Sequence, residues 1–188
     1  MRQFINIITE NQNILAEAKM APLYHGTNLL FLAAIVQDDS LSEGVHWGRE
    51  GEPNGPRLTR SYRVAMTFAT DQELEMGGVL VLDQQAIANR HKIAQYRDVD
   101  AYGNQWAADE AEEVPLTSEL KPLSRYLLSV NADPAQIKFL MENEDYMSYG
   151  VEESEANVVR AFETFDECRT ALKNLLDHPK LNTMVPRH

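Results

Sequence analysis

His25, Gly26 and Thr27 stand in a row, directly after Leu23 and Tyr24 and directly before an apolar run. Glycine weakens a regular strand, and an isolated histidine is more often a hydrogen-bonded core residue than a functional one. An imidazole can, however, donate or accept a hydrogen bond, and a glycine lets the backbone approach another group closely. The segment is therefore either an ordinary turn or a place where the backbone lies close to a partner.

Basic side chains gather in residues 49–63, which hold four arginines and two acids in a chain of net charge -12. A guanidinium group binds phosphate oxygens with two parallel hydrogen bonds, so this run could hold a phosphate-bearing ligand. Surface ion pairs are the simpler interpretation of the same composition. The two alternatives stay open at this point.

Acidic side chains form the run "DEAEE" at residues 109–113, immediately before Val114. Such a run is more often a solvated loop than a site. Glu113 nevertheless adjoins the apolar residues that begin a strand, where a carboxylate can be held in place. Because side chains alternate along a strand, only one of Glu112 and Glu113 can face a ligand, and Glu113 is the preferred one.

Composition limits the class of protein. The 188 residues, 44% hydrophobic and 24% charged, are typical of a soluble globular chain with one domain and a modest extension. The acidic balance argues against a broad nucleic-acid interface. The single cysteine, Cys168, excludes an internal disulfide, and the five histidines show no metal-ligand spacing, so no metal is expected. Without a long apolar run or the features of a secretion signal, we expect a cytoplasmic protein with no membrane partner.

The pattern of apolar residues, caps and turn residues predicts an α+β fold. Residues 1–20 are expected to form a helical arm. Strands are expected in 21–27, 77–82, 92–99, 112–116, 124–130 and 157–163, with a strand turning into a helix across 57–70. Helices are expected after the caps Asn28, Asp83, Asp133 and Thr164, the last with a capping box to Glu167. On the helix in 57–70, Val64, Ala65 and Phe68 are expected to share one face.

The order of "YHGT", a short helix, "LTRS…A..FA" and a late "EEV" strand resembles the ADP-ribosyltransferase fold, as in diphtheria toxin and the poly(ADP-ribose) polymerases. The chain is also similar to small transferase-like proteins of tailed phages. The likeness runs from about Leu23 to Val130. It implies two small packed β-sheets with flanking helices at residues 21–131, plus a C-terminal strand–helix extension at 132–188 that packs on the same domain.

The resemblance implies a role for each residue of the first segment. His25 would hydrogen-bond the adenosine ribose of NAD, and the backbone of Gly26 would contact the nicotinamide carboxamide. Thr27 would steady the turn. An aromatic ring would stack on the nicotinamide, with Phe68 as the first choice and Tyr62 as the second. On this view, Gly26→Ala should weaken NAD binding more than it destabilises the fold.

The resemblance also assigns the later motifs. Thr59 and Ser61 would brace the site, and Arg60 would contact the NAD pyrophosphate. A glutamate of the last strand would bind the 2'-hydroxyl of the nicotinamide ribose. Glu113 is preferred, with Glu112 as the alternative, so that His25 and these two glutamates make up the catalytic set.

The implied activity is an NAD-dependent ADP-ribosyltransferase that uses NAD as substrate and modifies a macromolecule, more readily a protein than a nucleic acid. Glu110 and Glu112 form a glutamate–x–glutamate pair that resembles the arginine-modifying toxin branch, which leaves the acceptor open. Two alternatives remain: an RNA 2'-phosphotransferase-like enzyme on the same scaffold, and a non-catalytic interaction protein that keeps the fold.

Overall fold

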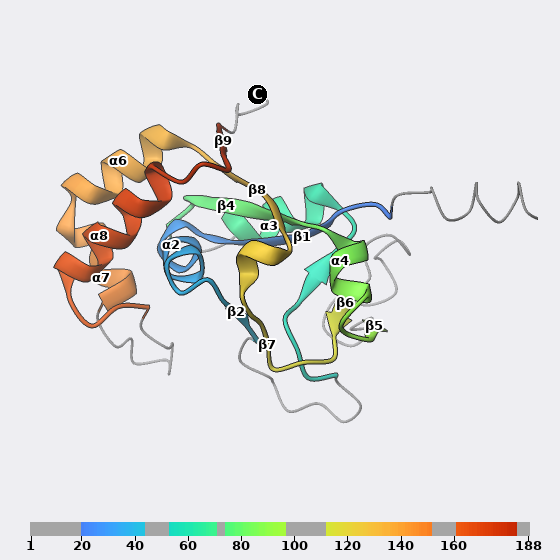
Figure 1. Cartoon of the computed structure of the whole chain (residues 1–188). Helices are drawn as coiled ribbons and strands as arrows, with labels where there is room; N and C mark the ends of the chain where they lie inside the picture. Colours follow the sequence, from blue (N-terminus) through green and yellow to red (C-terminus); the bar gives the residue numbers. More distant parts are fainter. Residues whose placement is uncertain (1–19, 44–52, 71–73, 97–111, 152–160, 184–188) are drawn as a thin grey trace, which may run out of the picture.

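A computed structural model describes residues 20–43, 53–70, 74–96, 112–151 and 161–183 of the chain. It is an α+β protein with one mixed sheet of seven strands and a second sheet of two strands (Figure 1). The predicted α+β class is therefore confirmed, whereas the expected pair of small packed sheets is instead one sheet of seven strands and one of two. No helix in the described ranges is long and apolar enough to cross a membrane.

The seven-stranded sheet has the order β5-β6-β3-β1-β4-β8-β9, and its neighbours are antiparallel except for the pair β8 and β9. The strands are β1 (Leu23–Asn28), β3 (Leu58–Thr59), β4 (Gly77–Leu82), β5 (Ile93–Tyr96), β6 (Glu112–Pro115), β8 (Leu127–Ala132) and β9 (Leu181–Thr183). The small sheet pairs β2 (Leu41–Ser42) with β7 (Glu119–Leu120). The two long strands β1 and β4 pair along their whole length at the centre of the sheet.

The helices are α2 (Leu29–Gln37), α3 (Tyr62–Thr70), α4 (Gln84–Ala88), α6 (Pro134–Glu142), α7 (Glu144–Val151) and α8 (Phe165–Leu176), with a 3-10 turn at Leu123–Arg125. Their predicted caps are confirmed. Side-chain oxygens of Asn28, Asp83, Asp133 and Thr164 each accept a backbone hydrogen bond from the first turn of the helix that follows. Glu167 also reaches back, as the predicted capping box requires, but its carboxylate accepts from the N–H of Glu163, one residue before the cap.

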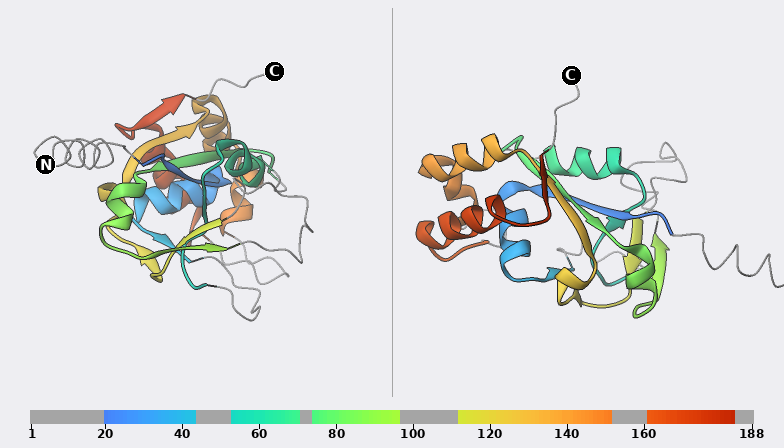
Figure 2. Two further views of the ribbon diagram at one scale, coloured as in Figure 1. Left: turned by 90° about the vertical axis from the view of Figure 1, so that its right-hand side faces the viewer. Right: turned by 45° about the horizontal axis from the view of Figure 1, so that its top comes forward.

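Helices cover the sheet on both faces. The α2 face carries Leu23 and Leu80, which belong to the large core together with Leu32 of α2. The α3 face carries Gly26 and Gly77, and a Cβ at either glycine would overlap a backbone carbonyl of α3. Figure 2 (right) shows α3 on one side of the central strands and α2 on the other. On the α2 face, leucine side chains thus fill the space between sheet and helix, whereas on the α3 face glycines let the helix backbone lie directly on the strands.

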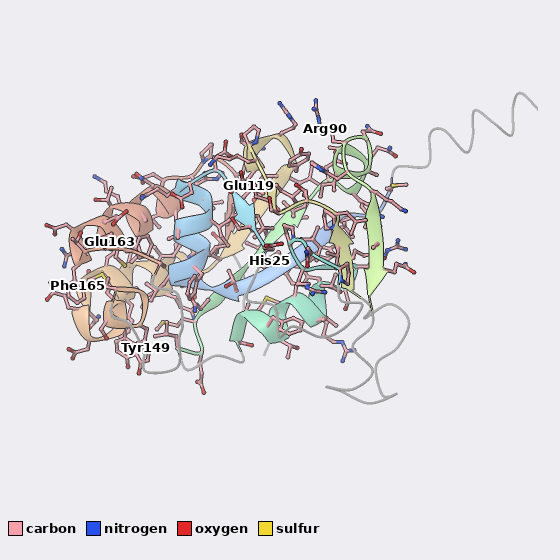
Figure 3. All side chains as sticks on the ribbon, turned by 90° about the horizontal axis from the view of Figure 1, so that it is seen from below. His25, Arg90, Glu119, Tyr149, Glu163 and Phe165 are labelled. Atoms are coloured by element: carbon pink, nitrogen blue, oxygen red, sulfur yellow. The ribbon has the colours of Figure 1, made fainter. Side chains whose placement is uncertain are left out.

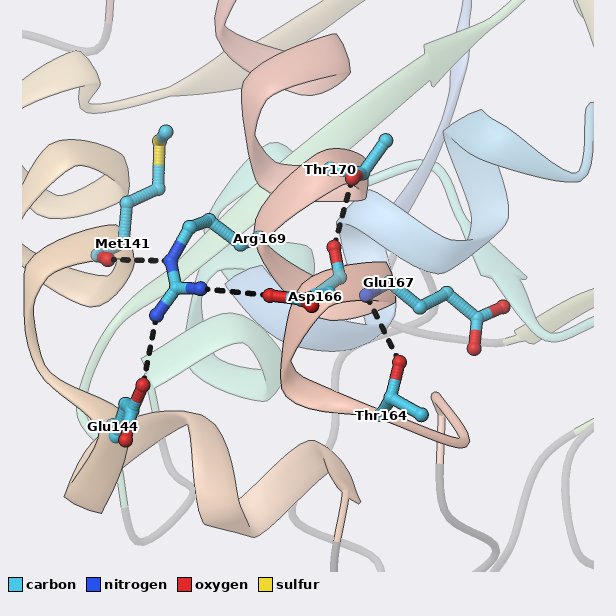
Figure 4. Close-up of polar contacts among 7 residues, drawn as sticks. All are labelled: Met141, Glu144, Thr164, Asp166, Glu167, Arg169 and Thr170. Carbon is cyan, nitrogen blue, oxygen red and sulfur yellow. Dashed lines mark hydrogen bonds and ion pairs between the residues drawn. The ribbon is translucent and has the colours of Figure 1, made fainter.

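The C-terminal helices join the same core. Cys168, Ala171 and Leu175 of α8 are fully buried in the cluster that also holds Leu23 of β1. On the outer side, Arg169 ties three helices together, because its guanidinium bonds the Met141 carbonyl of α6, Glu144 of α7 and Asp166 of α8 (Figure 4). The apolar face of α8 thus packs mainly on α2 and α6, and one arginine joins the three C-terminal helices on the outer side.

Several elements differ from the prediction. Helix α7 and strands β2, β7 and β9 were not predicted, and the expected strand at 157–163 lies mostly outside the described residues, while its last three residues form no strand. Thr27 is not in a turn, because β1 runs straight through it to Asn28 and pairs it with Gly78. Phe68 does not share the buried face of α3 with Val64 and Ala65; its side chain is 38% exposed.

Candidate functional site

A row of side chains crosses the α2 face of the sheet and includes the predicted histidine and glutamate. Gln95 of β5 pairs with Glu113 of β6, and Glu113 pairs with Leu58 of β3. Continuing the β1–β3 register by one residue from Tyr24↔Thr59 places His25 opposite Leu58. Neighbouring strands lie about 4.8 Å apart, so the backbones of His25 and Glu113 are roughly 10 Å apart on one face.

The carboxylate of Glu113 is almost entirely buried and is held by two donors. Arg60 Nε lies 2.7 Å from Glu113 Oε1, and Gln95 Nε2 donates to the same oxygen at 2.9 Å. The Glu113 side chain is 3% exposed, whereas the Arg60 side chain is 46% exposed. A buried carboxylate requires such partners. Here Gln95 belongs to β5 on one side of β6, and Arg60 directly follows β3 on the other side. Arg60, predicted to bind pyrophosphate, thus contacts Glu113.

His25 is partly buried and has a defined tautomer. Its Nδ1 lies 2.9 Å from the carbonyl oxygen of Arg57, which can only accept, so Nδ1 carries the proton and donates it. Burial lowers the pKa of His25, and the bond to the Arg57 carbonyl opposes that effect. At neutral pH the ring is therefore neutral, with Nε2 as an acceptor suited to a hydroxyl group.

We expect the lowered pKa of His25 to make stability depend on pH. The unfolded histidine binds a proton near pH 6.5, while the folded one binds it only at lower pH, so stability is fully present above that range and falls with the pH below it. Between pH 8 and pH 5.5, the free energy of unfolding measured in urea should decrease less in His25→Asn than in the wild type. The pKa of His178 is lowered too, mainly by burial, so His178→Asn should flatten the profile separately.

An unchanged pH profile in His25→Asn would contradict this assignment of the histidine. Asparagine is the appropriate replacement because its side-chain amide can still donate to the Arg57 carbonyl, which leaves that contact in place while the titration is removed.

Thr59 and Ser61 shape the start of α3. The Thr59 hydroxyl accepts from the backbone N–H of Ser61 at 3.1 Å, and the Ser61 hydroxyl accepts from the N–H of Val64 at 3.3 Å. The second contact follows the pattern of a helix N-cap. Both residues therefore hold the backbone on either side of Arg60, which is a local structural role.

The two aromatic candidates lie on the other side of the sheet from His25 and Glu113. Tyr62 is on α3, its ring meets that of Tyr24 edge to face with centroids 5.4 Å apart, and its hydroxyl accepts from Asn131. Since Tyr24 and Gly26 belong to the α3 face, alternation places His25 on the α2 face. Phe68 is further along the same helix. Neither ring is brought to the row that holds His25 and Glu113.

Gly26 lies close to a helix and not to an open edge. A Cβ at this position would come within 1.6 Å of the carbonyl oxygen of Ala65, and at Gly77 within 1.9 Å of that of Ala69. The two glycines thus let β1 and β4 pass under successive turns of α3. The predicted close approach of the backbone is present, but its partner is α3, which corrects the expectation that Gly26→Ala would act mainly on NAD.

The structure gives less information about the remaining candidate residues. Glu112 pairs with Thr59 in the β3–β6 ladder, and its side chain is outside the described structure, as are Arg49 and Glu110. Burial raises the pKa of the Cys168 thiol to about 11, so this cysteine stays protonated at neutral pH. The described ranges hold no group of three or more histidine, cysteine or acidic side chains placed to bind a metal ion.

Gln95 is the site residue that sequence reasoning missed. It occupies the third position of β5, a strand that was predicted, but nothing in a single glutamine indicates a carboxylate partner 18 residues away. A hairpin pairing of β5 with β6 would have supplied the signal, because it places Gln95 opposite Glu113. Figure 3 shows His25 near the middle of the molecule, away from Tyr149 and Phe165 at the end formed by α7 and α8.

No protein-family model, no curated protein and no solved structure matches the chain. The function therefore has to be argued from the residues and their geometry.

Proposed function

We propose that the protein is an NAD-dependent ADP-ribosyltransferase that works on the α2 face of the sheet, where His25 and Glu113 lie. The observation that carries the proposal is the placement of a neutral imidazole and a fixed carboxylate on one face, two strands apart. This is the pair of groups that the resemblance to ADP-ribosyltransferases requires from the first and the late strand.

The chemistry of these groups fits the reaction. Cleavage of the nicotinamide–ribose bond builds positive charge on the sugar, and a carboxylate already in place stabilises that charge without reorganisation. Glu113 would supply it. A neutral His25 would accept a hydrogen bond from a ribose hydroxyl through Nε2. The proposal assigns no stacking role to Tyr62 or Phe68, since both belong to the α3 side.

A non-catalytic interaction protein is the second candidate, and one observation favours it. The Glu113 carboxylate already has a cationic partner in Arg60, which is what a structural ion pair would look like. The two candidates differ in whether the protein cleaves NAD, so a product assay separates them.

The test is incubation with NAD labelled in its adenine half, with and without a cell lysate that supplies acceptors. Label on protein supports the transferase, and free ADP-ribose alone supports NAD cleavage without the right acceptor. A bound nucleotide should also stabilise the fold, by roughly 2.7 kcal/mol at about 100 times its dissociation constant. Folded protein that gives no product and no thermal shift at millimolar NAD would overturn the proposal.

A further inference from the structure

We infer that Gln95 is a positioning residue for the Glu113 carboxylate, and this inference rests on the proposed function. Gln95 lies directly opposite Glu113 in the β5–β6 ladder, so their side chains project from the same face. The Gln95 amide donates to Glu113 Oε1 at 2.9 Å. The contact joins the buried carboxylate of Glu113 to the exposed side chain of Gln95 on the next strand.

The carboxylate is held from two sides. Arg60 directly follows β3 and contacts Oε1 from that side of β6, and Gln95 of β5 contacts the same oxygen from the other side. A glutamate has three side-chain torsions, and one donor leaves its carboxylate free to rotate about the contact. Two donors that converge on one oxygen from opposite sides define where the group lies, which preorganised electrostatic stabilisation requires.

The two donors differ in charge, and that difference separates their functions. The Arg60 guanidinium makes burial of the carboxylate possible, but it also places positive charge beside a group that must stabilise a developing cation. The Gln95 amide is neutral, so it orients the carboxylate without adding positive charge. Gln95 is therefore the donor whose removal should disturb orientation while leaving the net charge of the site unchanged.

The inference is tested with Gln95→Met, which keeps the length of the side chain and removes the donor. We expect turnover in NAD cleavage to fall on the order of 10-fold to 100-fold, because a catalytic group out of position loses that much, with NAD affinity close to that of the wild type. Gln85→Met is the matched control, since Gln85 also donates to a side chain, that of Asn89, but on the exposed face of α4.

Two further readouts exclude a merely structural role. In the double variant Gln95→Met/Glu113→Gln, turnover should be no lower than in Glu113→Gln alone, because an orienting residue has no effect without the group it orients. Gln95→Glu removes the donor and places a like charge opposite Glu113, so kcat should fall while the KM for NAD stays close to the wild-type value. The second variant keeps the test available where Gln95→Met does not fold.

The outcomes distinguish this inference from the proposed function. Wild-type protein that cleaves no NAD overturns both. Wild-type protein that cleaves NAD and depends on Glu113, while Gln95→Met and Gln95→Glu both keep full turnover, overturns the role of Gln95 alone. Additive losses in the double variant would also contradict it.

Discussion

Gly26→Ala is expected to prevent the chain from reaching its native stability, whatever its effect on ligands. The added methyl would lie 1.6 Å from the carbonyl oxygen and 2.5 Å from the carbonyl carbon of Ala65. Both are backbone atoms, so no side-chain rotation relieves the overlap, and β1 and α3 have to move apart. Overpacking commonly costs about 1–3 kcal/mol, and we expect this substitution to exceed that range. Urea unfolding monitored by circular dichroism measures it.

Gly150→Ala provides the comparison. Gly150 lies inside α7, and the nearest atoms to an added Cβ are Cδ1 and Cβ of Leu30 at 3.2 and 3.3 Å, so a displacement of a few tenths of an ångström makes room for it. Alanine is also the better helix former by about 1 kcal/mol, so this variant should stay close to the wild type. Ala65→Gly added to Gly26→Ala should not rescue it, because the clash is with the carbonyl of residue 65. A stable Gly26→Ala protein with weakened NAD binding would contradict this explanation and indicate that Gly26 contacts the ligand.

Glu113→Gln is expected to lower the turnover of NAD cleavage by ~100-fold or more, the size of effect that follows the loss of one preorganised electrostatic contact. The amide keeps the size of the side chain and an oxygen that can accept from Arg60 and Gln95, so the fold should persist. The contact acts mainly in the transition state, and NAD affinity should therefore change little. Single-turnover cleavage and calorimetric NAD titration measure the two quantities.

Glu144→Gln is the matched control, because Glu144 is also paired with an arginine, Arg169, but at the far end of the molecule on α7. It should leave turnover unchanged. Glu112→Gln should be mild in cleavage, although it could abolish transfer if Glu112 activates the acceptor. The reverse pattern would move the catalytic carboxylate to the neighbouring residue and to the ladder position opposite Thr59. No effect of either glutamate would end the transferase proposal.

Local signals predicted those parts of the fold that local forces determine. Asn28, Asp83, Asp133 and Thr164 cap their helices because a short polar side chain bonds a free N–H three residues or fewer away, which needs no knowledge of the rest of the chain. Helix α7 was missed because only Met147 and Gly150 of its eight residues are buried, too few to give a helical period.

The parts that sequence could not supply depend on contacts between distant segments. Position 26 needs a glycine because the backbone of Ala65, 39 residues later in the chain, lies against it. Gln95 becomes a partner of Glu113 only when β5 pairs with β6. Phe68 was placed on the buried side because a helical period alone does not say which side meets the sheet. The strands that carry His25 and Glu113 were predicted. That the two side chains share one face could be deduced only from the register of β1, β3 and β6.

The strand order has a consequence for how the candidate site comes into being. β3 joins β1 to β6, so the row from His25 to Gln95 does not exist until residues more than 50 positions apart have paired. Closing such loops costs chain entropy before any contact compensates for it, which makes pairings of this kind slow compared with helix formation. A chain emerging from the ribosome can form α2 early, but it has no site before β6 is complete. Activity would then report that the long-range half of the sheet has assembled.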